Sequence, residues 1–192
     1  SSIELQDGTG ALNLRYRRPI AKNNNTNSFL NGEVTFKNGN ILYASRDVEM
    51  KNVNCRIVFR NSDVFVENLQ TSVLGQSIVM QGQAKNLLTL INTEPDKANI
   101  DWNIYSPSLN LESFTYLLDA RKKSSNSSGK KKGVAAASAK IDNLLEQGRL
   151  HVVLKTPALH YKKFDANNVV ADITLLQDRY IINNVSMTHA GG

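Results

Sequence analysis

The chain of 192 residues contains very little cysteine and no long hydrophobic run. Its single cysteine, Cys55, excludes an intrachain disulfide framework. The three histidines are scattered and show no zinc-ligand spacing. Uninterrupted apolar stretches span only a few residues, as at 133–137, whereas a membrane-spanning helix needs roughly 20. The composition therefore excludes a disulfide-rich scaffold and a transmembrane helix within this stretch.

The sequence also lacks recognisable catalytic motifs. His151, His160 and His189 have no nucleophilic motif around them, and we expect each to be a surface or strand histidine. Gly8 and Gly10 lack the spacing and the following helix of a dinucleotide-binding fingerprint. Acidic residues occur singly, so no paired-carboxylate site is visible. We therefore predict a protein that is not an enzyme and that uses no metal and no cofactor.

Basic residues outnumber acidic ones by 23 to 17, which gives a net charge of +6 and a pI near 9.4. A lysine-rich segment at 121–132 carries much of this excess and is typical of a solvated linker. Residues 15–18, Arg-Tyr-Arg-Arg, mix basic and aromatic side chains as a platform for single-stranded nucleic acid does. Because most other aromatic residues belong to apolar faces, we predict no nucleic-acid partner.

Alternation of apolar and polar residues dominates the rest of the chain, and Asn, Asp and Gly separate the alternating runs. This pattern is typical of antiparallel strands joined by tight turns. It predicts a mainly β fold: a curved antiparallel sheet built from repeated strand-turn-strand units, with a small helical insertion. Strands are predicted at 12–17, 32–36, 53–60, 64–69, 78–84, 99–105 and 150–154, with turns at 61–63 and at Gly75.

Two segments have helical spacing instead. The first follows Asn110, a predicted N-cap, and the second ends at Gly148, a natural C-terminal stop. Their apolar residues are Phe114, Leu117 and Leu118, and Ile141, Leu144 and Leu145. The Lys-, Ser-, Gly- and Ala-rich residues 120–140 are predicted to be a disordered linker. The predicted organisation is a first β unit at 1–109, the helical insertion at 110–148 and the start of a second β unit at 149–192.

A repeat supports two β units. The segment from Gly32 to Gln76 aligns with the segment from Gly148 to Gly192 at a constant offset of 116 positions and without a gap. Identical pairs include Gly32 and Gly148, Val53 and Val169, Ile57 and Ile173, Asn68 and Asn184, and Gly75 and Gly191. The alternating apolar positions coincide as well. A chance match of two amphipathic hairpins is the alternative, whereas true repetition predicts an elongated array of such units.

The second copy contains a turn of pattern Leu-x-Tyr-x-x-Phe-x-Ala and then a strand of pattern Val-x-x-x-Ile-x-Leu. The pattern residues are Leu159, Tyr161, Phe164, Ala166, Val169, Ile173 and Leu175. Together with the two preceding helical segments, this stretch resembles the C-terminal repeat region of AsmA-like proteins. The resemblance covers about residues 109–192 and is weak before about residue 30. The first copy departs from it, because Ser45 and Val48 replace Tyr161 and Phe164.

This resemblance implies a Gram-negative envelope protein, tethered to the inner membrane by an N-terminal helix outside this stretch, whose periplasmic part spans toward the outer membrane. AsmA-like proteins and their TamB relatives are regarded as bridge-like lipid carriers that support outer-membrane assembly. In them, a curved sheet holds phospholipid acyl chains in an apolar groove. No catalytic residues carry over. The ends of the sequence, Ser1-Ser2 and Gly191-Gly192, lead us to expect a segment of a longer protein.

Two apolar stripes are the candidate lipid-binding residues: Val53, Cys55, Ile57, Phe59, Val169, Ala171, Ile173 and Leu175. Withdrawing a lipid chain of about 15 methylenes from a bilayer costs roughly 12 kcal/mol, so a carrier needs continuous apolar surface. The stripes supply it only if their sheets join. The expected partners are then phospholipid acyl chains and unidentified envelope proteins, with membrane contact through parts outside this chain. The alternative is an envelope scaffold in which the stripes fill a closed β core. The six apolar residues of the predicted helices could cover either a lipid groove or such a core.

Overall fold

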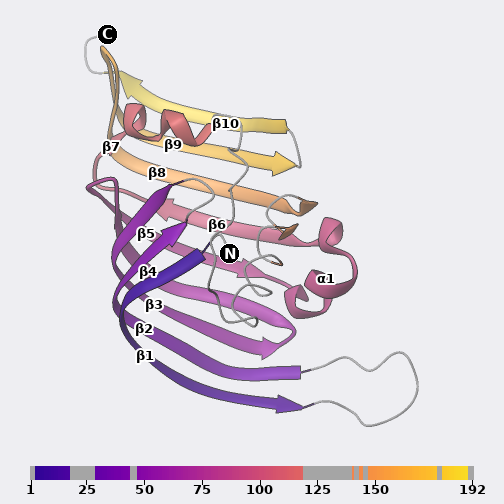
Figure 1. Ribbon diagram of the computed structural model, residues 1–192. Coiled ribbons are helices and arrows are strands. Elements are labelled where there is room, and N and C mark those ends of the chain that lie inside the picture. Colours follow the sequence, from indigo (N-terminus) through magenta and orange to yellow (C-terminus); the bar gives the residue numbers. More distant parts are fainter. Residues whose placement is uncertain are drawn as a thin grey trace.

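A computed structural model of the chain describes residues 3–17, 29–43, 47–118, 140, 143–144, 147–176 and 179–189. Ten strands form one open, mostly antiparallel sheet with a few short helices (Figure 1). The predicted fold class is confirmed. Within these residues, no helix is long and apolar enough to cross a membrane.

The strands follow one another across the sheet almost in chain order, β1-β2-β3-β4-β5-β6-β8-β9-β10. Their bounds are β1 Ile3–Arg17, β2 Phe29–Tyr43, β3 Val48–Asn61, β4 Asp63–Val73, β5 Gln76–Ala84, β6 Asn99–Tyr105, β7 Leu109–Asn110, β8 Arg149–Tyr161, β9 Phe164–Leu176 and β10 Arg179–His189. The pair β6–β8 is parallel, and β7 pairs with β8 beyond the end of β6. A parallel pair needs a long crossover connection, and residues 106–148 provide it.

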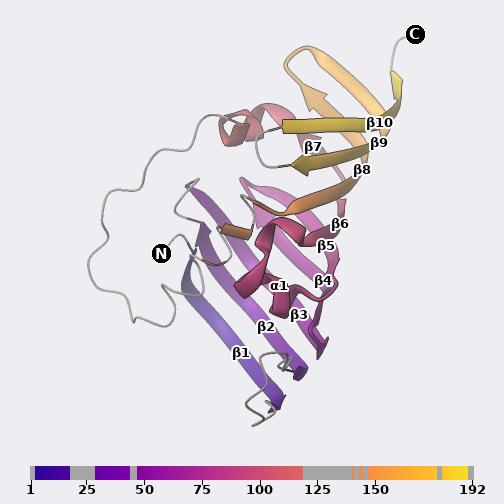
Figure 2. The same cartoon turned by 90° about the vertical axis from the view of Figure 1, so that its right-hand side faces the viewer.

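The sheet has an inner and an outer face. Its strands are bent, and the helix α1 (Leu87–Thr93) lies on the inner side of the bend (Figures 1 and 2). The inner face is apolar and carries α1 and the 3-10 helix η2 (Leu111–Leu118), whereas the outer face is mainly polar. This division follows from the period-two alternation of side chains along each strand.

Left-handed residues within the strands explain the bend. Asn38, Asn52, Asn68 and Asn168 all have φ of 51° or 52°, and each lies at a register shift between neighbouring strands, which for Asn168 is the β9–β10 pair. Asparagine tolerates this conformation better than most residues. Such bulges add one residue to a strand, bend it and increase its twist. They also shift the alternation by one position, which is why the strands are longer than the sequence predicted.

The repeat is present in the structure. Strand β4 (63–73) shifted by 116 positions gives the bounds of β10 (179–189). The pair Ile57–Val66 in β3–β4 corresponds to the pair Ile173–Ile182 in β9–β10, at the same offset. The bulge residues Asn52 and Asn168 also correspond. The pairing register of β3 with β4, which the sequence alone does not define, therefore recurs in β9 with β10, whereas β8 is shifted by two positions on β9 relative to β2 on β3.

Both predicted helices have described residues. Asn110 caps η2, because its Oδ1 accepts a hydrogen bond from the backbone N–H of Glu112 at 3.0 Å. In the second helix, Lys140, Asn143, Leu144 and Gln147 are helical, and the N–H of Gly148 donates to the carbonyl of Leu144 at 2.8 Å. Lys140 was predicted to end the linker. Residues 120–139, Ile141, Leu145 and the side chains of Leu117 and Leu118 lie outside what the structure describes.

The sequence did not predict helix α1 or the single 3-10 turn η1 (Pro95–Lys97) that follows it. The turn between β3 and β4 holds α1 in place. The backbone N–H of Asn86 donates to Oδ1 of Asp63 at 2.7 Å, and that of Leu88 donates to the carbonyl of Ser62 at 3.1 Å. These two bonds direct α1 onto the inner face.

Candidate functional site

The eight candidate residues lie on the inner face of a single sheet. The first stripe is on β3 and the second on β9, with β4, β5, β6 and β8 between them. The two stripes are thus parts of one continuous surface. Their neighbours Arg56 and Asp172 point to the outer face, as strand alternation requires.

Directly opposed residues form an unbroken apolar row across nine strands. The row consists of Leu12, Val34, Ile57, Val66, Gly82, Trp102, Val152, Ile173 and Ile182, and we call it the middle row. With neighbouring strands about 4.8 Å apart, it extends over roughly 38 Å from one sheet edge to the other. The row includes Ile57 from the first stripe and Ile173 from the second.

A second apolar row runs beside it. It consists of Leu14, Gly32, Phe59, Val64, Ala84, Ile100, Leu150, Leu175 and Tyr180. Phe59 and Leu175 are its stripe residues. Two adjacent rows whose only polar side chain is Tyr180, at the end of the second row, give the continuous apolar surface that the stripes alone do not provide.

Exposure differs along the inner face. Leu12 and Ile182, at the two ends of the middle row, are 71% and 67% exposed. Val53 and Val169 are only 1% and 3% exposed, and Ala171 is also buried. Cys55, Ile57, Phe59, Ile173 and Leu175 are partly buried. Three of the eight candidates are therefore core residues, and five retain accessible surface.

The helices cover the inner face at opposite ends of the central strands. Helix α1 packs on the cluster of Ala84, Ala98, Ile100 and Leu144, through Leu87, Leu90 and Ile91. At the other end, Phe114 of η2 packs both on the cluster around Val169 and on the cluster of Val48, Val73 and Ile78. The middle row runs between these two contact sites, with Trp102 touching the α1 cluster.

Cys55 faces Phe36 on the inner face and has no disulfide partner. Burial raises the pKa of its thiol, which disfavours the reactive thiolate near neutral pH. Cys55 therefore serves as a small apolar side chain of the inner face.

Strand β1 separates the basic and aromatic residues that suggested a nucleic-acid platform. Tyr16 opposes Leu30 on the inner face, whereas Arg15 and Arg17 alternate onto the outer face. Arg18 and the lysine-rich residues 121–132 lie outside the described residues. Among those that the structure describes, no three His, Cys, Asp or Glu side chains are grouped to hold a metal ion.

No protein-family model, curated protein or solved structure matches this chain. The resemblance to AsmA-like proteins therefore depends on the sequence patterns described above.

Proposed function

We propose that this chain is a non-enzymatic, lipid-binding segment of a periplasmic AsmA-like protein involved in outer-membrane assembly. Its inner face holds phospholipid acyl chains on their way between the inner and outer membranes. The observation that carries this proposal is the middle row, which is apolar from one edge of the sheet to the other.

The energetic requirement supports a path along the rows. Each methylene taken out of a bilayer needs about 0.8 kcal/mol of replacement apolar contact. An acyl chain that lies across the strands, along the middle and second rows, contacts apolar side chains over its whole length. An acyl chain that lies along one central strand contacts only the short apolar stripe of that strand and then the helices, because α1 and η2 occupy the two ends of the central strands. The acyl chain therefore lies across the strands, between the helices.

The scaffold alternative requires a closed β core. In the described part of the chain there is one open sheet, and both ends of the middle row are exposed. Burial of Val53, Val169 and Ala171 gives those three residues a structural role. The accessible lipid positions are then Cys55, Ile57, Phe59, Ile173 and Leu175, of which Ile57 and Ile173 lie in the middle row.

Site-specific photo-crosslinking in the full-length protein in cells tests this function. A photoreactive residue at Ile57 or Ile173 should give phospholipid adducts. Val58 and Val170 are matched controls, because they are partly buried aliphatic residues of the same strands on the outer face. They are better controls than Arg56 and Asp172, whose side chains hold polar contacts. Capture of protein alone at Ile57 and Ile173 would favour the scaffold.

A further inference from the structure

The outer face carries one polar network in each copy of the repeat. In the first copy, Arg56 on β3 lies between two carboxylates. Its Nε is 3.0 Å from Oε2 of Glu33 on β2, and its Nη1 is 2.8 Å from Oε2 of Glu67 on β4. An arginine is always protonated in proteins, so this network keeps its cation at any ordinary pH.

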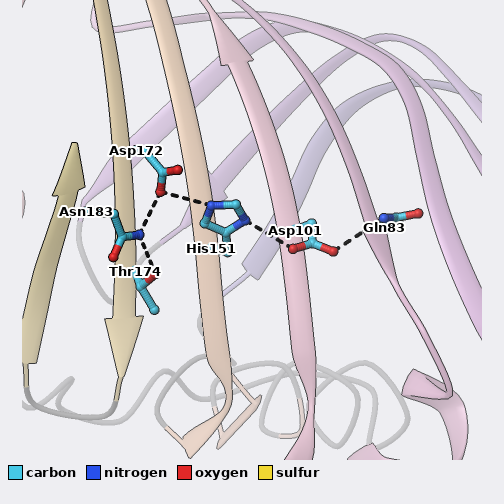
Figure 3. Close-up of polar contacts among 6 residues, drawn as sticks. All are labelled: Gln83, Asp101, His151, Asp172, Thr174 and Asn183. Atoms are coloured by element: carbon cyan, nitrogen blue, oxygen red, sulfur yellow. Dashed lines mark hydrogen bonds and ion pairs between the residues drawn. The ribbon is translucent and has the colours of Figure 1, made fainter. Parts of the chain in front are cut away.

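The second copy places different chemistry at the corresponding positions. Asp172 and Asn183 stand 116 positions after Arg56 and Glu67, and His151 stands 118 positions after Glu33. Figure 3 shows their contacts: Nε2 of His151 is 3.0 Å from Oδ1 of Asp172, which also accepts a hydrogen bond from Nδ2 of Asn183 at 2.7 Å. Arg56 in the first copy and Asp172 in the second copy thus each link three neighbouring strands through side-chain contacts.

His151 also reaches across the parallel seam, the β6–β8 pair where strands of the predicted β units 1–109 and 149–192 meet. Its Nδ1 is 3.2 Å from Oδ1 of Asp101 on β6, and Gln83 on β5 donates to the other oxygen of Asp101 at 3.3 Å (Figure 3). His151 therefore lies between two acids on the flanking strands, as Arg56 does in the first copy. The network connects five strands, from β5 to β10, through this one ring.

The ring can satisfy both acids in only one protonation state. A neutral imidazole has one N–H and one acceptor nitrogen, whereas the imidazolium has two N–H donors. With a carboxylate oxygen near each ring nitrogen, the neutral ring must direct a lone pair at one of them. The imidazolium donates to both.

The charges around the ring are those of Asp101 from β6 and Asp172 from β9, while β5 and β10 contribute the neutral Gln83 and Asn183. On β8 itself, Arg149 lies two residues before His151 on the same face. The hydrogen bond from Asn183, followed by the hydrogen bond and charge of His151, lowers the pKa of Asp172 and keeps this carboxylate ionised. Arg149 is mostly solvated, so the two acids dominate the surroundings of the ring.

We propose that His151 is a proton-dependent clasp across the seam between the two β units. Protonation of the ring fastens β6, β8 and β9 together on the outer face, and deprotonation releases one of the two contacts. This inference does not rest on lipid binding, because the clasp lies on the opposite face from the middle row.

Unfolding of the 192-residue chain by urea, followed between about pH 8 and pH 5.5, tests the clasp in the range where histidine titrates. Stability rises toward low pH when the folded state binds more protons than the unfolded state. The urea midpoint of the unmodified chain should therefore rise as the pH falls. His151→Gln should remove most of this rise. His160→Gln is the matched control, since His160 contacts a single acid, Asp165, near the β8–β9 turn, and it should keep the rise.

His151→Arg provides a second test that does not depend on weakening the sheet. It places a permanent cation between Asp101 and Asp172, as Arg56 stands in the first copy. The midpoint should then lose most of its pH dependence and stay high at about pH 8. A midpoint rise that survives in both His151 variants, or that His160→Gln also abolishes, would overturn the clasp.

Amide hydrogen exchange, corrected for intrinsic pH effects, separates a seam clasp from a general effect of charge. Protection at low pH should increase in β6, β8 and β9 and stay constant in β2 and β3. An increase spread evenly over the sheet would show that the seam is not the element that responds.

Discussion

The indole of Trp102 lies on Gly82 of the neighbouring strand, so closely that a Cβ atom at residue 82 would be 2.9 Å from the ring. The two residues are directly paired in the middle row. The missing side chain of Gly82 leaves the space that the large side chain of Trp102 fills. The row therefore stays continuous at its smallest member.

Gly82→Ala should destabilise the chain by about 1–3 kcal/mol, the usual cost of overpacking. In an ordinary strand, alanine is preferred over glycine, so replacing a glycine usually stabilises the protein. Here the contact with Trp102 makes the same change destabilising. The free energy of unfolding in urea measures the effect. Gln81→Ala, at the next and exposed position on the outer face, should change it by less than about 0.5 kcal/mol. Equal stability of Gly82→Ala and the unmodified chain would contradict the packing argument.

Trp102 is the only tryptophan of the chain and is a built-in probe of the middle row. If acyl chains lie along that row, phospholipids with brominated acyl chains should quench its fluorescence, because bromine quenches only at close range. A chain that combines Trp102→Phe with Tyr105→Trp is the control. It moves the probe to an exposed position of the same strand on the outer face, where quenching should be much weaker. Equal quenching at both positions would indicate non-specific contact with the vesicles.

Asn168 adopts φ of 52° at the bulge of β9, and its counterpart Asn52 has the same φ. Residues with a Cβ atom lose roughly 1–2 kcal/mol in this conformation, and asparagine loses less than most. Asn168→Ala should therefore lower the free energy of unfolding by about 1 kcal/mol, whereas Asn168→Gly should preserve it. The exposed neighbour Asn167, which has no positive φ, serves as the control when changed to alanine. A loss of stability in the glycine variant as large as in the alanine variant would show that the side chain, not the backbone conformation, matters.

The strand pattern could be predicted from the sequence because each strand has one apolar face and one mainly polar face. Val53, Cys55, Ile57 and Phe59 alternate with neighbours that are polar except for Val58, and the structure places all four on the inner face. Strand lengths were underestimated where a bulge residue such as Asn38 or Asn52 interrupts the alternation. An asparagine in a bulge and an asparagine in a turn look alike in a sequence, because both use the left-handed conformation.

Helix α1 was missed for a different reason. Its residues Leu87, Leu90 and Ile91 have helical spacing, but the helix is only seven residues long and no side chain caps its N-terminus, so the sequence carries no start signal for it. Its position depends on Ser62 and Asp63, more than twenty residues earlier. The contacts of His151 were equally invisible, since its two acids lie 50 positions before it and 21 positions after it.

The sequence by itself determined that the strands have an apolar and a polar side and that two similar units follow one another, because alternation and repetition are local properties of the chain. Only the tertiary structure decided that Ile57 and Ile173 belong to one row, with four strands between them. Strand order, the parallel pairing of β6 with β8 and the register of each pair arise from hydrogen bonds between distant segments. Those bonds align the side chains of separate strands, and that alignment turns two short stripes into a surface that crosses the whole sheet.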